Sequence, residues 1–218
     1  MNVMSTKHLP KMRIPLSFNC DTRRASATRW GALLLALALL DPAFGAGAED
    51  VLKAGVFSPP RIAPDFTLRG SNGNDLVFSG YRGKVVLLSF GYTSCTEVCP
   101  ITLAMLAQAR RQLGAAGADL QVVYVTVDPE RDSAKRMHDY LANFDPSFIG
   151  GTGTAEQLAA VRKDYGIVAT KIPTPGGYAM AHSSFVYLVD RGGNLRAMMP
   201  FGHNADDYVH DVKLLLKK

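Results

Sequence analysis

Two almost continuously apolar runs constrain the fold of this chain more than any other feature. Residues 84–90 read KVVLLSF and residues 120–127 read LQVVYVTV. A strand with one face in water alternates apolar and polar residues, whereas a strand buried on both faces is apolar throughout. Helical patterns separate and follow these runs, so helices are available to cover both faces. The sequence therefore predicts an α/β fold around a central sheet.

The remaining periodic segments extend this sheet. Residues 184–189 form a third apolar run, and the turn at 190–194 predicts a hairpin with 195–199. The short segments 66–68 and 76–78 flank a Gly- and Asn-rich turn and predict a hairpin near the N-terminal end. Helices are expected over residues 102–113, 133–143, 155–165 and 205–216. We therefore expect a mixed sheet flanked by helices, with an N-terminal β-hairpin, compatible with a thioredoxin-like core.

The first 48 residues have the features of a targeting leader. Arginines at 23, 24 and 29 precede an apolar stretch at 30–40, and the small residues AGA occupy 46–48. A basic region, a short apolar region and a small-residue site are typical of a secretory signal peptide. Eleven apolar residues are too few to span a membrane, which takes about 20. The expected organisation is a signal peptide at 1–48, an extended lead-in or tether at 49–63, and one domain at 64–218.

Removal of this leader changes the charge and the cysteine count. The net charge falls from +5 to about +1, because the leader holds six of the 24 basic residues and two of the 19 acidic ones. No basic surface for nucleic acid is then expected, and membrane association is expected only through an uncleaved leader. Cys20 leaves with the leader, so the exported protein has Cys95 and Cys99.

These two cysteines form the strongest local motif, Cys-Thr-Glu-Val-Cys-Pro at 95–100. It follows a predicted buried strand and precedes a predicted helix, which is where open α/β sheets place their sites. Their i, i+4 spacing is expected to put the two thiols on nearly the same helical face, and a helix N-terminus lowers thiol pKa values. Such a pair suits a soft metal ion or a reversible disulfide. A purely stabilising disulfide is less favoured, because so short a loop gains little chain entropy.

Two soft sulfur ligands favour Cu(I) or zinc, and a neutral imidazole suits either as a third ligand. Of the four histidines after residue 48, His138 and His210 fall on predicted helices and are expected to be surface or boundary residues. His203 falls in a loop, where capping or solvation is expected. His182 immediately precedes the strand at 184–189. In a thioredoxin-like sheet the start of that strand lies beside the cysteine loop, but the spacing alone leaves the role of His182 open.

Three segments resemble one known family. FGYTSCTEVCPITL at 90–103, VTVDPERDSAKRMHDYLANFD at 125–145 and YAMAHSSFVYLVDRGGNLR at 178–196 resemble the SCO/SenC family. Members of this family are thioredoxin-fold, copper-binding assembly factors for cytochrome c oxidase. The resemblance extends over about residues 64–216, in the family's order.

The resemblance implies one copper ion per domain, as Cu(I) or Cu(II), bound by Cys95, Cys99 and His182. It implies a metallochaperone that donates copper to the oxidase's copper-site subunit, with thiol–disulfide exchange by Cys95 and Cys99 as a second activity. Another periplasmic copper chaperone or a thiol reductant is expected as a further partner. The leader favours a bacterial periplasm, with the domain either soluble or tethered to the inner membrane.

One position departs from the family. Members commonly have an acidic residue directly before the ligand histidine, where this chain has Ala181. The ligands are unaffected, but the choice of partner and the balance of the two activities are open. Asp128 also falls in a family segment, and we expect it to be a turn or helix-capping carboxylate.

Other functions of the same fold compete with this interpretation. Thr96, Cys99 and Pro100 resemble part of the active-site loop of thiol peroxidases, although that pattern has a proline where this chain has Tyr92, and it gives His182 no role. A pure thiol–disulfide oxidoreductase and a copper sensor are two further candidate functions for such a domain. Copper binding, peroxide turnover and the effect of gene deletion on oxidase activity distinguish these functions.

Overall fold

A computed structural model describes residues 51–217 of the 218-residue chain. Within these residues, eight strands form one mixed sheet in the order β1-β10-β9-β4-β5-β6-β2-β3. Strands β4, β5 and β6 run parallel to one another, and the other neighbours pair antiparallel. The strand bounds are β1 Gly55–Ile62, β2 Thr67–Gly70, β3 Asp75–Val77, β4 Val85–Gly91, β5 Leu120–Thr126, β6 Ile149–Thr152, β9 Phe185–Val189 and β10 Asn194–Pro200. The predicted leader at 1–48 and its Cys20 lie outside the described residues.

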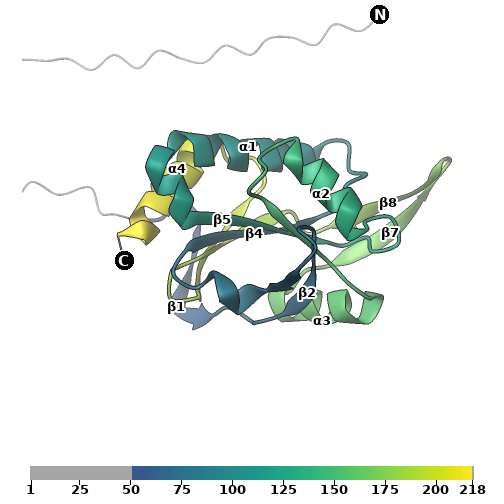
Figure 1. Ribbon diagram of the computed structural model, residues 1–218, viewed down its shortest axis with the longest axis horizontal. Helices are drawn as coiled ribbons and strands as arrows, with labels where there is room; N and C mark the ends of the chain where they lie inside the picture. Colours follow the sequence, from purple (N-terminus) through teal and green to yellow (C-terminus); the bar gives the residue numbers. More distant parts are fainter. Residues whose placement is uncertain (1–50, 218) are drawn as a thin grey trace, which may run out of the picture. The chain divides into compact units, whose positions relative to one another are not determined.

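Helices cover both faces of this sheet. Figure 1 shows α1, α2 and α4 along one face and α3 along the other. Their bounds are α1 Val98–Gln112, α2 Ala134–Ala142, α3 Ala155–Tyr165 and α4 Ala205–Leu216, and two short 3-10 helices occupy Phe78–Tyr81 and Gly114–Asp119. This arrangement confirms the predicted α/β fold with a mixed sheet between helices. No helix in residues 51–217 is both long enough and apolar enough to cross a membrane.

The elements with the clearest sequence patterns form as predicted. Every residue of β4 and β5 is buried, as their apolar runs require. Helix α3 begins at the Thr154 cap, where Thr154 and Gln157 form a reciprocal capping box. It ends at Gly166, whose φ of 67° is left-handed and favours glycine. The N-terminal hairpin is the antiparallel pair β2–β3 at one edge of the sheet.

Two strands were not predicted. Strand β1 lies within the expected lead-in and pairs with β10 at the opposite edge. Its prolines, Pro59 and Pro60, fall between the paired ends, which an edge strand tolerates. Strand β6 contains Gly150 and Gly151, residues that are depleted in strands. A Cβ at Gly150 would lie 2.8 Å from Cε of Met137, so glycine here permits close packing of α2 on the sheet.

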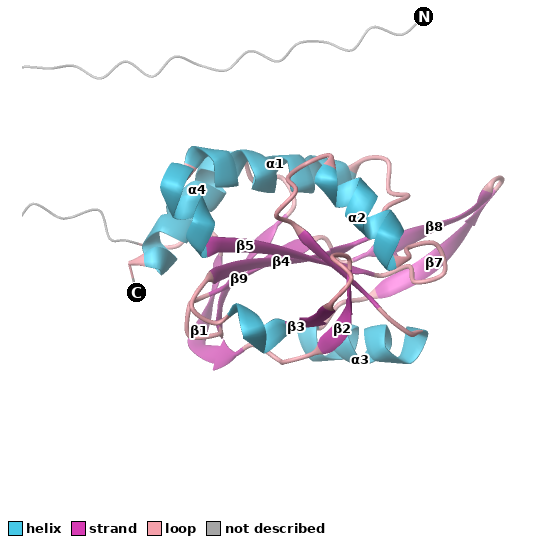
Figure 2. Cartoon of the chain, in the orientation of Figure 1, coloured by secondary structure: helices cyan, strands magenta, loops and turns pink. Residues whose placement is uncertain are grey.

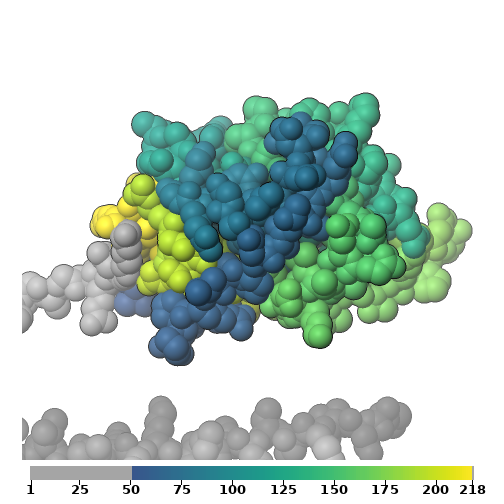
Figure 3. Space-filling view, turned by 60° about the horizontal axis from the view of Figure 1, so that its bottom comes forward, coloured from purple at the N-terminus to yellow at the C-terminus, as the bar shows by residue number. Residues whose placement is uncertain are grey.

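A two-stranded arm was also not predicted. Strands β7 (Ala169–Thr174) and β8 (Gly177–His182) pair antiparallel as a separate sheet. Figure 2 shows the arm extending away from the central sheet, and in the space-filling view of Figure 3 it forms a projection at one end. Residues 170–177 are all exposed, so neither face of this ribbon produces an apolar alternation in the sequence.

Candidate metal centre

The cysteine motif lies at the carboxyl end of β4, but the helix begins earlier than predicted. Helix α1 starts at Val98, because Pro100 falls in the first turn, where its missing N–H costs nothing. Cys99 is therefore in the first turn, and Cys95 lies in the loop before the helix. The expectation that both cysteines occupy one helical face is wrong. The two side chains meet because the loop folds back, placing Cys95 within hydrogen-bonding distance of Cys99.

The two free thiols differ in exposure and in acidity. The hydrogen bond from Cys99 lowers the pKa of Cys95 to about 5, with further hydrogen bonds from backbone groups of Cys99 and Glu97; partial burial opposes this shift. The same thiol–thiol hydrogen bond, followed by burial, raises the pKa of Cys99 far above its usual range. Cys95 is thus the thiolate and Cys99 its proton donor, so the pKa-lowering effect predicted for a helix N-terminus fails for Cys99.

His182, the last residue of β8, lies beside this pair. Its Nε2 is 3.6 Å from Sγ of Cys99, and its Nδ1 is 2.9 Å from the backbone carbonyl oxygen of Ser183. A carbonyl oxygen only accepts, so Nδ1 donates to it. Nε2, the ring nitrogen that faces Cys99, is then the one placed to bind a metal.

The structure therefore brings together the three residues that the sequence singled out. Two sulfurs and one imidazole nitrogen form a soft donor set that suits copper, above all Cu(I). No group of three or more His, Cys, Asp or Glu side chains in residues 51–217 already has the arrangement of a metal site. The other histidines lie elsewhere, as expected: His138 is exposed, and His203 and His210 are paired with Asp207 and Asp211.

The cysteine loop is fixed by a buried carboxylate that the sequence analysis missed. Asp132 is fully buried and accepts hydrogen bonds from the backbone N–H of Thr93 at 3.0 Å, the Thr93 hydroxyl at 2.6 Å and the Thr126 hydroxyl at 2.7 Å. Arg136 donates to the Thr93 hydroxyl at 2.7 Å. Asp132 thereby connects the loop before Cys95 to the end of β5 and to the start of α2.

A second cluster anchors the arm that bears His182. The Arg131 guanidinium lies 3.9 Å from the ring centroid of Tyr178 and 5.6 Å from that of Tyr92, and it donates to the Tyr178 carbonyl oxygen at 2.9 Å. Asp128 is ion-paired with Arg131 and accepts the Tyr178 hydroxyl at 2.7 Å. The expected turn at Asp128 is present, but its helix-capping role is not, because Ser133 caps α2. Asp128 instead connects the arm to the body of the domain.

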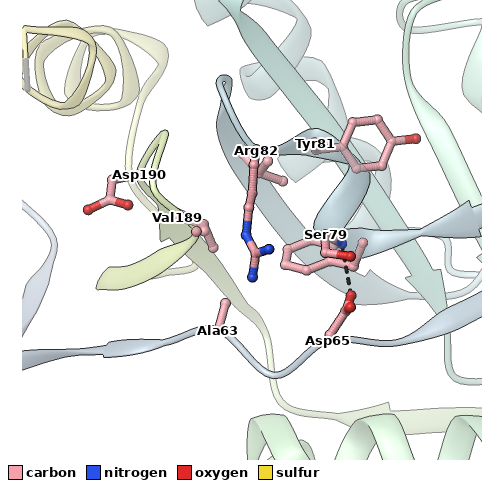
Figure 4. Close-up of a pocket in the computed structure, with 10 residues that line it drawn as sticks. Ala63, Asp65, Ser79, Tyr81, Arg82, Val189 and Asp190 are labelled. Carbon is pink, nitrogen blue, oxygen red and sulfur yellow. Dashed lines mark hydrogen bonds between the residues drawn. The ribbon is translucent and has the colours of Figure 1, made fainter.

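A second hollow lies at the other end of β4, around Val86, and has different chemistry. Figure 4 shows the Arg82 side chain reaching into it, close to Ala63 and Val189. Asp65 at its rim already accepts the backbone N–H of Ser79 at 2.8 Å. Neither a thiol nor an imidazole lines this hollow. Of these two places, only the cysteine end of the sheet has the soft donor atoms of the predicted metal site.

Comparison with known proteins decides the family. The SCO1/SenC family model matches residues 56–217. The chain belongs to the SCO1/SenC family. An SCO2-like protein of Rickettsia felis is 32% identical over 167 residues, which cover 75% of this chain and 80% of the relative.

Solved structures agree with this assignment. Bradyrhizobium japonicum ScoI with copper bound matches with 33% identity and a TM-score of 0.67, covering 71% of this chain and 99% of that one. Apo Sco1 of Thermus thermophilus matches with 33% identity and a TM-score of 0.70, covering 78% and 100%. The fold of this SCO1/SenC domain is thioredoxin-like, as predicted.

The pH dependence of alkylation tests the difference between the two thiols. Because the pKa of Cys95 is lowered to about 5, its thiolate persists above that pH and is lost as the pH falls through it. We expect Cys95 of the reduced protein to react with iodoacetamide with a midpoint near pH 5, whereas an ordinary cysteine has a midpoint near about 8.5. Mass spectrometry of each cysteine peptide measures this. In Cys99→Ala the midpoint should rise, and a wild-type midpoint near 8.5 would contradict the assignment.

Proposed function

We propose that this protein is an exported copper chaperone that binds one copper ion through Cys95, Cys99 and His182 and delivers it to the copper-site subunit of a cytochrome c oxidase. The observation that carries the proposal is the approach of His182 Nε2 to within 3.6 Å of Cys99 Sγ, with the second thiol hydrogen-bonded to the first. Residues 83 positions apart in the chain are brought into contact as one soft donor set. Copper bound to the related ScoI supports copper as the metal.

The accessibility of the site supports transfer rather than storage. Cys95 and His182 are each partly exposed, whereas Cys99 is buried. A partner can therefore reach two of the three donors and displace them one at a time. The leader predicted at residues 1–48 favours the bacterial periplasm as the place of this transfer, where another copper chaperone would supply the metal.

Thiol–disulfide exchange is the second activity that we propose for the same pair. The Cys95 thiolate is the nucleophile, and the Cys99 thiol lies where it can attack a mixed disulfide at Cys95. In this way the protein would reduce the partner's cysteines before copper is transferred, and a periplasmic thiol reductant would restore the pair. Oxidation of the pair removes two copper ligands, so copper occupancy and redox state are coupled.

A thiol peroxidase function fits the site less well. In that mechanism Cys99, with the Thr96 hydroxyl, would have to be the reactive thiolate. Cys99 is buried and its pKa is raised, and Thr96 is exposed. Rapid peroxide turnover by the copper-free protein would favour the peroxidase instead.

Gene deletion tests the assembly role. We expect a strain of the source bacterium that lacks the gene to lose most of its cytochrome c oxidase activity in copper-poor medium and to regain part of it with added copper. Oxidase activity in membranes, with the amount of oxidase protein as reference, measures this. The wild-type gene should complement, and His182→Ala should not, although it retains both thiols. Normal oxidase activity in the deletion strain would contradict the proposal, and complementation by His182→Ala would favour a reductase.

A further inference from the structure

A buried tyrosine hydroxyl contacts the sulfur of Cys99. Tyr124 lies in the middle of β5 and is 1% exposed. Its hydroxyl donates to the Tyr92 carbonyl oxygen at 3.4 Å and also lies within hydrogen-bonding reach of the Cys99 side chain. A tyrosine hydroxyl is protonated at neutral pH, so it can donate a hydrogen bond to the sulfur. Copper ligation by two cysteines and a histidine assigns no task to this group.

Gly91, the last residue of β4, provides the space in which the hydroxyl and the sulfur meet. A Cβ at this position would lie 2.1 Å from the Tyr124 hydroxyl oxygen and 2.8 Å from Cys99 Sγ. Both distances are far shorter than a real Cβ contact, so any side chain here would displace one atom or both. Glycine is therefore required at position 91 because a Cβ would overlap with the hydroxyl oxygen and the sulfur. The carboxyl end of β4, the adjacent parallel strand β5 and the first turn of α1 therefore converge on a single polar contact.

The strength of the hydrogen bond between the Tyr124 hydroxyl and the Cys99 sulfur depends on the redox state of the sulfur. A disulfide sulfur is neutral and accepts hydrogen bonds weakly. The reduced pair holds a negative charge that the disulfide lacks, shared by two adjacent sulfurs, and the Tyr124 hydroxyl lies beside one of them. Hydrogen bonds to charged acceptors are about twice as strong as neutral ones. The Tyr124 hydroxyl thus stabilises the reduced pair more than the disulfide.

We propose that Tyr124 is a positioning residue that holds the Cys99 sulfur by a hydrogen bond and sets the reduction potential of the Cys95–Cys99 pair. The proposal deepens the proposed function, because it concerns how readily the same pair is kept in its copper-binding form. It does not require that the protein deliver copper, since the potential is a property of the metal-free protein.

A glutathione redox buffer measures this potential without metal. The protein disulfide and two glutathione molecules are in equilibrium with glutathione disulfide, one protein thiol, one protein thiolate and a released proton. Two electrons move from the two glutathione sulfurs to the two protein sulfurs. We expect Tyr124→Phe to shift this equilibrium roughly fivefold toward the protein disulfide, since it removes one hydrogen bond from the reduced state. That shift corresponds to a potential about 20 mV more negative at 29.6 mV per tenfold.

Tyr165→Phe is the matched control. Tyr165 is also buried, and its hydroxyl donates to the Pro64 carbonyl oxygen at 2.7 Å, with no cysteine among its partners. This variant should lose stability in the same way but keep the wild-type potential. Gly91→Ala, which forces the hydroxyl and the sulfur apart, should shift the potential in the same direction as Tyr124→Phe, and it provides the measurement if Tyr124→Phe does not fold.

Two outcomes would overturn the proposal. One is a wild-type potential in Tyr124→Phe, or in Gly91→Ala if only that variant folds. The other is an equal shift in Tyr165→Phe, which would indicate a general effect of lost packing or stability. If Tyr124→Phe has the wild-type reduction potential and also binds copper like the wild type, Tyr124 does not set the potential. The proposed chaperone function is then unaffected. Loss of copper binding in His182→Ala bears on the chaperone function alone.

Discussion

Replacing Cys99 with serine is expected to lower the Cu(I) affinity of the reduced protein by about a thousandfold or more. A serine hydroxyl is a hard, neutral donor at neutral pH, whereas copper(I) prefers the thiolate that metal binding draws from Cys99. Cys95→Ser should have a loss of the same order, since it removes the other sulfur. His182→Ala should lose less, about a hundredfold, because a neutral imidazole contributes one ligand without charge.

Competition with a chromophoric Cu(I) chelator, carried out on the reduced protein without oxygen, measures these affinities. The matched control is His138→Ala, an exposed histidine on α2, which should bind copper like the wild type. Circular dichroism of each variant separates loss of a ligand from loss of the fold. Wild-type Cu(I) affinity in His182→Ala would reject the three-ligand site. Wild-type Cu(I) affinity in Cys99→Ser would reject the cysteine pair as copper ligands.

The parts of this fold that sequence patterns predict are those in which a local rule and the tertiary structure agree. The runs at 84–90 and 120–127 predicted buried strands because both faces of β4 and β5 are covered. Helix α3 was predicted to the residue because its first turn has a capping threonine and its end a glycine. The glycines of β6 and the exposed arm β7–β8 break such rules. Their strands are specified by what packs or pairs beside them, and that information is distant in sequence.

The site shows the same division. Motif reasoning identified Cys95, Cys99 and His182, because the chemistry of each is visible in its residue type. The predicted geometry of the two cysteines was wrong. The apolar pattern placed Pro100 before the helix, whereas the first turn of α1 includes it, so Cys99 lies in the helix and Cys95 in the preceding loop. Asp132 and Tyr124 were missed, since a lone carboxylate and a strand tyrosine give no local sign of their partners. A buried hydrogen bond to the loop or to a sulfur is visible only after folding.

Asp132→Ala is expected to produce the largest loss of stability among the residues around the site. The carboxylate is fully buried and accepts three hydrogen bonds, two of them from Thr93 and one from Thr126. Alanine would leave those donors unsatisfied in a dry environment, at a cost of about 1–3 kcal/mol for each unpaired group. After partial relaxation we expect a loss of about 3 kcal/mol, which lowers the Tm of a domain of this size by roughly 6–12 °C.

The variant should also loosen the loop that bears Cys95, because Thr93 is held to β5 and α2 through Asp132. Thermal unfolding measures the stability, and alkylation of the buried Cys99 at a temperature well below Tm measures the opening of the loop. Asp139→Ala is the matched control, since Asp139 is an exposed carboxylate paired with Lys135 one turn away on α2, and such pairs contribute little. Equal Tm values for Asp132→Ala and Asp139→Ala would contradict the role given to the buried carboxylate. A lower Tm with Cys99 as protected as in the wild type would confine that role to stability, and the loop before Cys95 would then be held by its other contacts.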